Sequence, residues 1–509
     1  MRKGWWFALV AGILLFLHLV NLSLVPDFWW DEGWTVNVAR NWVERGVYGQ
    51  MLNGELRPPG LSASFVNVIP IAVSFRLLGI GLWQARLVTV LFSFLALLML
   101  FLLTKRLYNS TVGWGALFVV ILMTPHMATN PVYMGRQVMA EMPLMFYLLL
   151  GYYAFSRVSE RPGWGLLMVF SWGVALDCKL QPLPFWLVSL LLPLVLLLWR
   201  RERRLAAWLA LGLIGSWVFS LALSWLWESA MQHIIPSGDL LSGLLRVLVF
   251  TMDASARQLA FWIFLLSGLP VFSGLFYGIQ SWWKQQVHQA STVPAFQTTS
   301  REIAPVMLWI FSASWMAWYV LFSIGWARYL MPALFFGSPF LAAALYDWLD
   351  GYRLGSALQK AGAALRAFRL NGKFWLTLWA LLSVVLMVYL TLSQFMQNYD
   401  PEKGRAVFRV ARFVGDNTPP DALIETYDSE LLFLIDRRFH YPPDDTNLAM
   451  IAMDADPDLR IRYDPLVADP DYIIVGRFSR AAKLYQDVVA GDRFRLIYED
   501  GAYEVYEAR

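Results

Sequence analysis

Two adjacent carboxylates, Asp31 and Glu32, follow the first long apolar run and have side chains suited to general-base chemistry. They lie in Trp29-Trp30-Asp31-Glu32-Gly33, and tryptophans beside an apolar run belong at the headgroup level of a membrane. A carboxylate that is partly desolvated among tryptophans has a raised proton affinity, so it can accept a proton from a hydroxyl group. Two solvated loop carboxylates without a chemical role are the alternative interpretation.

An arginine beside two prolines further along the same loop suits phosphate recognition. Arg57 precedes Pro58-Pro59, and the prolines reduce the backbone freedom around it. The guanidinium group matches the geometry of a phosphate. An interfacial arginine that binds lipid headgroups is the alternative.

A second pair of charges, Arg136 and Glu141, lies at the start of a later apolar run. A charge at the mouth of a membrane helix is costly unless it is paired or hydrated, and such residues are functional by default. A purely structural Arg136–Glu141 ion pair is the alternative.

Three further charges, Lys179, His233 and Arg328, lie in other connections between apolar runs, and Tyr329 follows Arg328. Each charge alone could be a topology anchor or a snorkelling side chain. On the topology given below, all three reach the same face of the membrane as the residues above. Carboxylates and cations gathered at one face suit chemistry on an anionic, lipid-borne substrate whose phosphate must be neutralised as it leaves.

The elements that position these residues are membrane helices. Of 509 residues, 58% are hydrophobic and 15% are charged, against roughly 25% charged in a soluble domain. Runs of about 18 or more apolar residues, long enough to cross a hydrocarbon core of about 30 Å, recur until about residue 394 and exclude a soluble globular protein. We expect about eleven spans, near 5–25, 87–104, 112–126, 140–156, 163–177, 184–199, 206–226, 259–279, 304–325, 331–347 and 374–394.

The basic residues set the orientation of these spans. They cluster at alternate helix ends, at 2–3, 105–106, 157–161, 200–204, 284–301 and 353–373, which predicts a cytoplasmic N-terminus. The net charge of +4 therefore reflects topology, and no nucleic-acid partner is expected. Because eleven is odd, the outer side receives the loops 26–86, 127–139, 177–183, 227–258 and 326–330 together with the C-terminal tail.

The sequence bears on signal-peptide cleavage and on disulfide formation. The first 25 residues have a basic start but no small-residue cleavage site, so they are expected to remain as the first helix. Cys178 is the single cysteine of the chain, so no intrachain disulfide can form.

Three segments outside the spans have helical patterns. Residues 34–45 place Trp34, Val38 and Trp42 on one stripe, which predicts an amphipathic helix lying flat in the membrane interface. Residues 61–79 are expected to form a second interfacial helix, with an extra span as the alternative. The basic linker 348–373 is expected to bind anionic membrane lipids.

The composition changes to that of a soluble domain from about residue 399. We expect a transmembrane domain over 1–398 and a small extracytoplasmic α/β domain over 399–509, with helices near 402–415 and 429–436 and strands near 422–427 and 471–476. Residues 494–498 and 503–506 flank Asp500-Gly501, which predicts a terminal hairpin.

The charged motifs, taken in order, resemble those of the GT-C glycosyltransferases, within the protein mannosyltransferase and lipid A aminoarabinose transferase branch. The motifs are Asp31-Glu32, Arg57-Pro58-Pro59, Ala85-Arg86-Leu87, Arg136 with Glu141-Met142-Pro143, and Arg328-Tyr329-Leu330 with Pro332. The resemblance covers nearly the whole chain. It implies a polytopic α-helical GT-C fold in the plasma membrane and a role in glycosylation at the cell envelope.

The implied reaction moves a hexose or pentose from a polyprenyl-phosphate carrier to an acceptor glycan, lipid or protein, with inversion at the anomeric carbon. Asp31 would be the base, Glu32 is a further candidate catalytic residue, and Glu141 would position the acceptor or sugar. Substrate contacts are expected from Arg57, Arg136, Lys179, His233, Arg328 and Tyr329, of which Arg57, Lys179 and Arg328 would hold the departing phosphate. Arg57 stands where lysine is common and Glu141 where aspartate is frequent, so the donor sugar stays open.

Some members of this group bind a divalent metal near the first-loop acids, and Glu32, Glu44 or His233 are the candidate ligands here. The sequence lacks the clustered spacing that would indicate a metal site. A cofactor requirement is therefore left unknown.

The main rival interpretation is a transporter or lipid flippase. Transporters commonly have inverted repeats and charges near the bilayer midplane, whereas this chain has its charges at one face and no visible repeat. A receptor-like tail with a membrane anchor would need one helix rather than about eleven. The sequence favours the enzyme.

Overall fold

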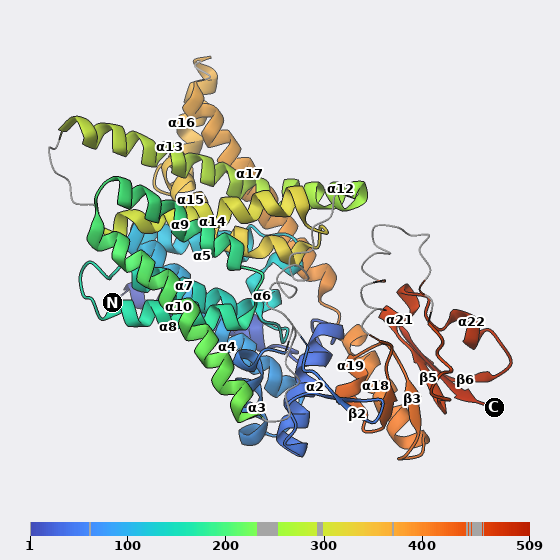
Figure 1. The fold of residues 1–509 in the computed structure, drawn as a ribbon. Helices are drawn as coiled ribbons and strands as arrows, with labels where there is room; N and C mark the ends of the chain where they lie inside the picture. Colours follow the sequence, from blue (N-terminus) through green and yellow to red (C-terminus); the bar gives the residue numbers. More distant parts are fainter. Residues whose placement is uncertain are drawn as a thin grey trace.

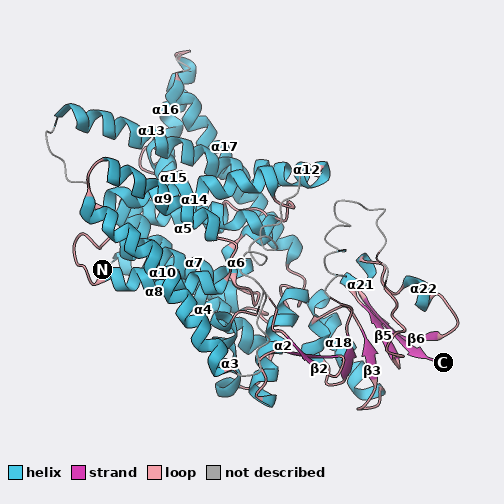
Figure 2. Cartoon of the chain, viewed as in Figure 1, coloured by secondary structure: helices cyan, strands magenta, loops and turns pink. Residues whose placement is uncertain are grey.

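The computed structural model of the chain describes residues 2–60, 63–231, 253–292, 299–368, 371–443, 446, 449, 461 and 463–509. Long helices form a bundle, and a small sheet with its own helices lies beside one end of it (Figures 1 and 2). The predicted fold class, a helical membrane protein with a small C-terminal α/β unit, is confirmed.

Each of the eleven predicted stretches contains a helix. The helices are α1 (Arg2–Leu19), α4 (Leu82–Leu107), α5 (Ser110–Leu122), α7 (Glu141–Phe155), α8 (Trp164–Cys178), α9 (Leu183–Trp199), α10 (Arg203–Ala230), α12 (Ala254–Ile263) continuing through a π-helical turn into α13 (Leu269–Thr292), α14 (Ser300–Phe322), α15 (Met331–Trp348) and α17 (Gly372–Asn398). Within the described residues, six helical stretches are long and apolar enough to cross a membrane. The count of eleven crossings stays a prediction.

The most enclosed helix of the bundle is α15, which buries every residue from Met331 to Leu345. Glycines allow its neighbours to approach closely, because a Cβ at Gly274 of α13 would overlap the backbone of Leu341. Small residues at such contacts are typical of membrane helix packing. The short 3₁₀ helix η3 (Ala327–Leu330) leads directly into α15, so the core of the bundle fixes the position of Arg328.

The first outer loop contains α2 (Trp30–Arg45), a hairpin of β1 (Gln50–Leu52) and β2 (Glu55–Arg57), and α3 (Phe65–Leu78). Carboxylates in the first turn of α2 favour its N-terminus, and Gly46 ends the helix in the left-handed conformation. The 14 residues of α3 span about 21 Å, less than a bilayer core, which favours the interfacial prediction for this segment.

The expectation that the apolar stripe of α2 faces lipid is corrected by the structure. Val38 is fully buried, and the Trp42 ring packs edge-on against Trp227 with the ring centroids 5.3 Å apart. Trp34 packs against Tyr441 of the C-terminal tail. Protein therefore covers the stripe, because the tail folds back over α2, which its sequence periodicity alone does not reveal.

The C-terminal unit begins at α18 (Pro401–Asn417), where the Asp400 side chain caps the first turn. Its sheet has the order β4-β3-β5-β7-β6, with β3 parallel to both β4 and β5 and the other pairs antiparallel. The elements are β3 (Leu423–Glu425), α19 (Glu430–Leu434), β4 (Arg438–His440), β5 (Tyr472–Val475), α21 (Arg477–Ala481), α22 (Gln486–Val489), β6 (Phe494–Asp500) and β7 (Tyr503–Ala508). The predicted elements, including the terminal hairpin, are confirmed, whereas the sequence pattern did not predict β4, α21 and α22.

The remaining short helices connect these parts. They are η1 (Met127–Thr129) and α6 (Pro131–Met134) in the second outer loop, and α16 (Leu354–Arg366) in the basic linker. The linker helix exposes Leu354, Leu358 and Leu365.

Candidate active site

Asp31 lies at the start of α2, where Arg328 Nη1 donates a hydrogen bond to its Oδ2 atom. Both side chains are mostly enclosed, with 19% of Asp31 and 15% of Arg328 exposed. The guanidinium group lies over Trp29, Trp326 and Tyr329, with its Cζ 4.8 to 5.4 Å from the ring centroids. The three rings and the Arg328 guanidinium group enclose most of Asp31 and leave part of its side chain exposed. Its position at the membrane interface stays a prediction.

A second ion pair joins Glu141, at the start of α7, to Lys179, directly after α8. Lys179 Nζ lies 2.8 Å from Glu141 Oε1, and the glutamate side chain is 3% exposed. The Lys179 ammonium group also lies 5.5 Å from the centre of the Tyr329 ring. Because Arg328 packs on the same ring, the two ion pairs meet at Tyr329, and the structure brings together five of the expected residues: Asp31, Glu141, Lys179, Arg328 and Tyr329.

Glu32 points away from this group and is fully buried with Arg86. The guanidinium group donates to both carboxylate oxygens at 2.8 and 2.6 Å, and the Val138 amide donates to one of them at 2.8 Å. Arg86 also donates to the backbone oxygens of Leu22 and Pro26. This placement argues against the expected catalytic or metal-binding role of Glu32 and indicates that the pair joins the first loop to α4.

Arg86 lies in the Ala85-Arg86-Leu87 motif, which by itself indicates no role for the arginine. The sequence does indicate that Arg86 needs a partner, because an arginine near the start of the long apolar helix α4 is a charge that is costly in a membrane unless it is paired. Sequence alone did not indicate that the partner is Glu32.

Arg136 contacts backbone carbonyl groups rather than Glu141. It donates to the carbonyl oxygens of Leu17, Val20 and Val25 at 2.5 to 2.8 Å and is 5% exposed. A helix leaves its last carbonyl groups without partners, and a cation there is favourable. Arg136 therefore closes the C-terminal end of α1, which argues against the expected substrate contact and against the alternative pair with Glu141.

Arg57 lies at the end of β2 with 49% of its side chain exposed and Glu55 3.4 Å away. The Pro-Pro step beside it is tied to α2, since Trp34 Nε1 donates to the Pro59 carbonyl at 2.7 Å. Within the described residues, no hydrogen bond or ion pair joins Arg57 to the Asp31–Arg328 pair or to the Glu141–Lys179 pair. Its role as a phosphate ligand stays a prediction.

The candidate metal ligands do not form a site within the part of the chain that the structure describes. Glu32 is occupied by Arg86, Glu44 is hydrogen-bonded to Arg40, and His233 lies outside the described residues. No group of three or more His, Cys, Asp or Glu side chains suited to a metal is found among the described residues.

The C-terminal unit holds the helix that carries Asp31, a relationship that the sequence did not indicate. Trp30 Nε1 donates to the Tyr427 carbonyl at 2.9 Å, and Ser429 Oγ donates to the Trp30 carbonyl at 2.6 Å. Arg477 Nη2 lies 2.8 Å from Asp27 Oδ2 just before α2. The tail thus contributes to the rigidity of the site.

Comparisons with known proteins agree with this architecture. A family model described as dolichyl-phosphate-mannose-protein mannosyltransferase matches residues 65–225. No curated protein sequence matches the chain significantly. The solved structures that are similar along nearly the whole of this chain include the following three.

Two of them are ArnT from Cupriavidus metallidurans. The form bound to undecaprenyl phosphate has a TM-score of 0.66 and 15% identity over 98% of this chain and 97% of that one. The apo form has a TM-score of 0.60 and 14% identity over 99% and 98%. The apo oligosaccharyltransferase of Archaeoglobus fulgidus has a TM-score of 0.55 and 12% identity over 95% of this chain and 70% of that one.

Proposed function

We propose that this chain, a multi-pass membrane protein with the fold of the GT-C glycosyltransferases, transfers a sugar from a polyprenyl-phosphate carrier to an acceptor hydroxyl group. The undecaprenyl phosphate bound to the similar ArnT structure supports this class of carrier. The observation that carries the proposal is the meeting of the Asp31–Arg328 and Glu141–Lys179 pairs at Tyr329. It supplies a base and cations at one small site, as transfer from an anionic carrier requires.

In the proposed reaction, Asp31 takes the proton of the acceptor hydroxyl as its oxygen attacks the anomeric carbon of the sugar. The bond between that carbon and the phosphate oxygen breaks, and polyprenyl phosphate leaves on the opposite face, so the configuration inverts. Fixed positive groups stabilise the charge that develops on the leaving phosphate. Arg328 orients Asp31 before reaction and, with Lys179 and Arg57, supplies that charge.

Glu141 has a positioning role in this scheme. Its enclosed carboxylate holds the Lys179 ammonium group at 2.8 Å, and in this scheme it also contacts a hydroxyl group of the sugar or acceptor. Such a contact fixes the geometry of the reacting atoms, which is a large part of catalysis.

The alternating basic clusters support a site that opens on the extracytoplasmic face of the plasma membrane, with a cytoplasmic N-terminus. Polyprenyl carriers place their phosphate at the headgroup level, where Trp29 and Trp326 surround Arg328. This is the level at which Asp31 lies in the proposed orientation.

The test is incubation of the purified chain with a panel of polyprenyl-phosphate hexoses and pentoses together with extracted envelope acceptors. We expect release of polyprenyl phosphate and labelling of an acceptor with at least one donor. The Lys360→Ala variant, on the linker helix α16, is a control that should keep full activity. Movement of intact lipid-linked sugar across vesicles without release of polyprenyl phosphate would instead identify a flippase.

A further inference from the structure

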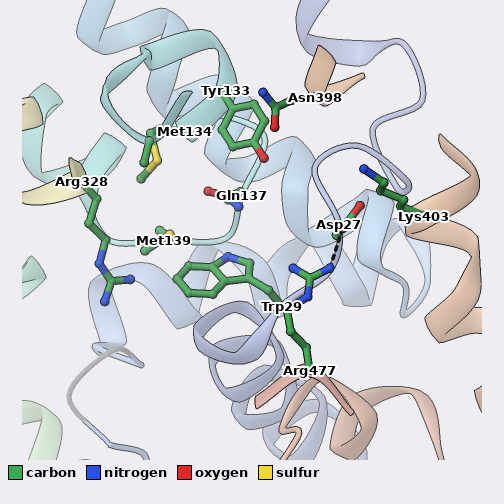
Figure 3. A pocket seen from close by; sticks show the side chains of 11 residues that line it. Asp27, Trp29, Tyr133, Met134, Gln137, Met139, Arg328, Asn398, Lys403 and Arg477 are labelled. Carbon is green, nitrogen blue, oxygen red and sulfur yellow. Dashed lines mark hydrogen bonds and ion pairs between the residues drawn. The ribbon is translucent and has the colours of Figure 1, made fainter. Parts of the chain in front are cut away.

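A cavity of about 290 Å³ lies between the first loop, the second outer loop and the C-terminal unit. Figure 3 shows Arg328 on one side of it, Trp29 in the centre, and Lys403 and Arg477 on the side of the C-terminal unit. Tyr133, Gln137 and Asn398 add neutral polar groups to its lining, and Met134 and Met139 add apolar ones. The cavity is thus a mixed polar and apolar space that begins at the proposed site.

The charges around this cavity are mainly positive. Arg328, Lys403 and Arg477 line it, against the single carboxylate of Asp27. Asp27 is paired with Arg477 at 2.8 Å, and no ion pair of Lys403 is recorded among the described residues. A cleft lined by one sign of charge attracts a ligand of the opposite sign, so the lining favours an anion.

Close packing fixes the backbone segments that carry the two cations of the C-terminal unit. Next to Lys403, Gly404 lies so close to the Leu24 carbonyl that a Cβ would overlap it. The Asp428 carboxylate accepts from the Gly476 and Phe478 amides at 3.0 and 2.8 Å, which holds the first residues of α21. Arg477 is therefore held by the backbone on both sides, although 55% of its side chain is exposed.

The cavity shares only Arg328 with the three cations proposed above to hold the donor phosphate. Arg57 and Lys179 do not line it, whereas Trp29 and Arg328 do. Arg328 is paired with Asp31, so a molecule that fills the cavity from the C-terminal unit ends beside the proposed base. In a transfer reaction that position belongs to the acceptor.

We propose that the acceptor carries an anionic group, a phosphate or a carboxylate, and that Arg477 and Lys403 bind this group while the acceptor hydroxyl reaches Asp31. This inference rests on the proposed function. It assigns the C-terminal unit a direct part in acceptor selection, in addition to its support of α2.

The first experiment measures binding without catalysis. The full chain in detergent is titrated with a phosphorylated glycolipid and with its dephosphorylated counterpart, and complexes are counted by native mass spectrometry. We expect the phosphorylated form to bind at least about tenfold more tightly, the size of one hydrogen bond to a charged group. Equal binding of the two forms would overturn the proposal.

Substitutions at the two cations test where the anionic group binds. Arg477→Gln and Lys403→Gln should each lose most of the preference, whereas Arg477→Lys should keep it because the charge remains. Arg480→Gln on the same helix as Arg477 and Arg405→Gln on the same helix as Lys403 are matched controls, since neither residue lines the cavity, and both should bind as wild type. If Arg480→Gln and Arg405→Gln lost the preference for the phosphorylated form while Arg477→Gln and Lys403→Gln kept it, the assignment of the anion to Arg477 and Lys403 would be wrong.

Polyprenyl phosphate, titrated against the same variants, separates donor from acceptor. Its binding should be unchanged by Arg477→Gln and Lys403→Gln, and weakened donor binding would assign the cavity to the carrier and overturn the inference. Charge-dependent glycolipid binding without any sugar transfer would support the anion site and count against the proposed function, so the two failures are distinguishable.

Discussion

Gly33, two residues after the proposed base, lies directly against the backbone of Glu430, where a Cβ atom at position 33 would overlap the Glu430 N and Cα atoms. Two hydrogen bonds flank this contact, from Trp30 to Tyr427 and from Ser429 to Trp30. The helix that carries Asp31 and the start of α19 therefore form one packed unit. A change on either side should reach the other.

Gly33→Ala should weaken this contact, because the overlapping atoms belong to the backbone and cannot rotate away. We expect a loss of about 1–3 kcal/mol in stability, the usual cost of overpacking, and reduced sugar transfer. Thermal unfolding in detergent and the transfer rate measure the two effects. Gly12→Ala is the control, because no atom lies within 4 Å of the place that its Cβ would occupy. Equal losses of stability and transfer rate in the two variants would contradict the packing argument.

The free energy of unfolding should depend on pH through Glu430, which forms this contact. Burial, with the neighbouring Asp428 carboxylate, raises the pKa of Glu430 to about 8, whereas an unfolded glutamate titrates near 4.3. Between these values the folded state keeps a proton that the unfolded state loses, so the free energy of unfolding falls as pH rises from about 5 to 8 and then levels off. Glu430→Gln should remove the part of this dependence that comes from Glu430, leaving the parts from Asp428 and Glu425, whose pKa values burial also raises. Glu402→Gln should not change it. A wild-type melting temperature that falls no more steeply than that of Glu430→Gln over this range would refute the assignment.

Glu32→Gln should reduce folding rather than turnover alone. Removing one partner of a buried ion pair typically costs about 3–5 kcal/mol, because the other charge is left unpaired. Arg86→Gln should behave in the same way, and the double variant Glu32→Leu/Arg86→Met should recover part of the loss. The melting temperature and the yield of folded protein are the measurements. A Glu32→Gln protein that folds normally but is inactive would place Glu32 in the chemistry after all.

The proposed orientation predicts which exposed positions are reached from outside the cell. Asp436→Cys in the C-terminal unit, with 75% of its side chain exposed, should react with an impermeant maleimide in intact cells. Lys360→Cys in the linker, with 58% exposed, should react only after permeabilisation, and the native Cys178 is buried. The reverse pattern would place the site on the cytoplasmic face.

Local pattern was enough to predict most elements of the fold. Apolar runs located the helices because a membrane requires continuous apolar length, and Asp500-Gly501 located the final turn. The strand β4 was missed because its three residues, Arg438–His440, have no alternating pattern. Its strand character comes from parallel pairing with β3, a non-local contact.

The sequence pointed to charged residues that the structure brings together at the candidate site, but it did not show which of them form ion pairs with each other. Asp31 and Glu32 are adjacent in sequence, yet successive residues of a helix point about 100° apart, so one meets Arg328 and the other meets Arg86. Nothing in the sequence distinguishes Arg136 from Arg328. The two differ only in the fold, where the partners of Arg136 are backbone carbonyl groups at and after the end of α1. Pairings between distant segments follow from tertiary packing and have no local signal.

The most direct test of the account is the turnover of Asp31→Asn in a reconstituted assay with a known donor and saturating acceptor. Asparagine keeps the shape of the side chain but cannot take a proton, and loss of a general base typically costs about 10²- to 10⁴-fold in rate. We predict that loss, with donor binding and protein yield largely intact, and a mixed effect on rate and affinity for Glu141→Gln. An Asp31→Asn enzyme within a few-fold of wild type, beside an inactive Glu141→Gln enzyme, would contradict the account and assign the base to Glu141.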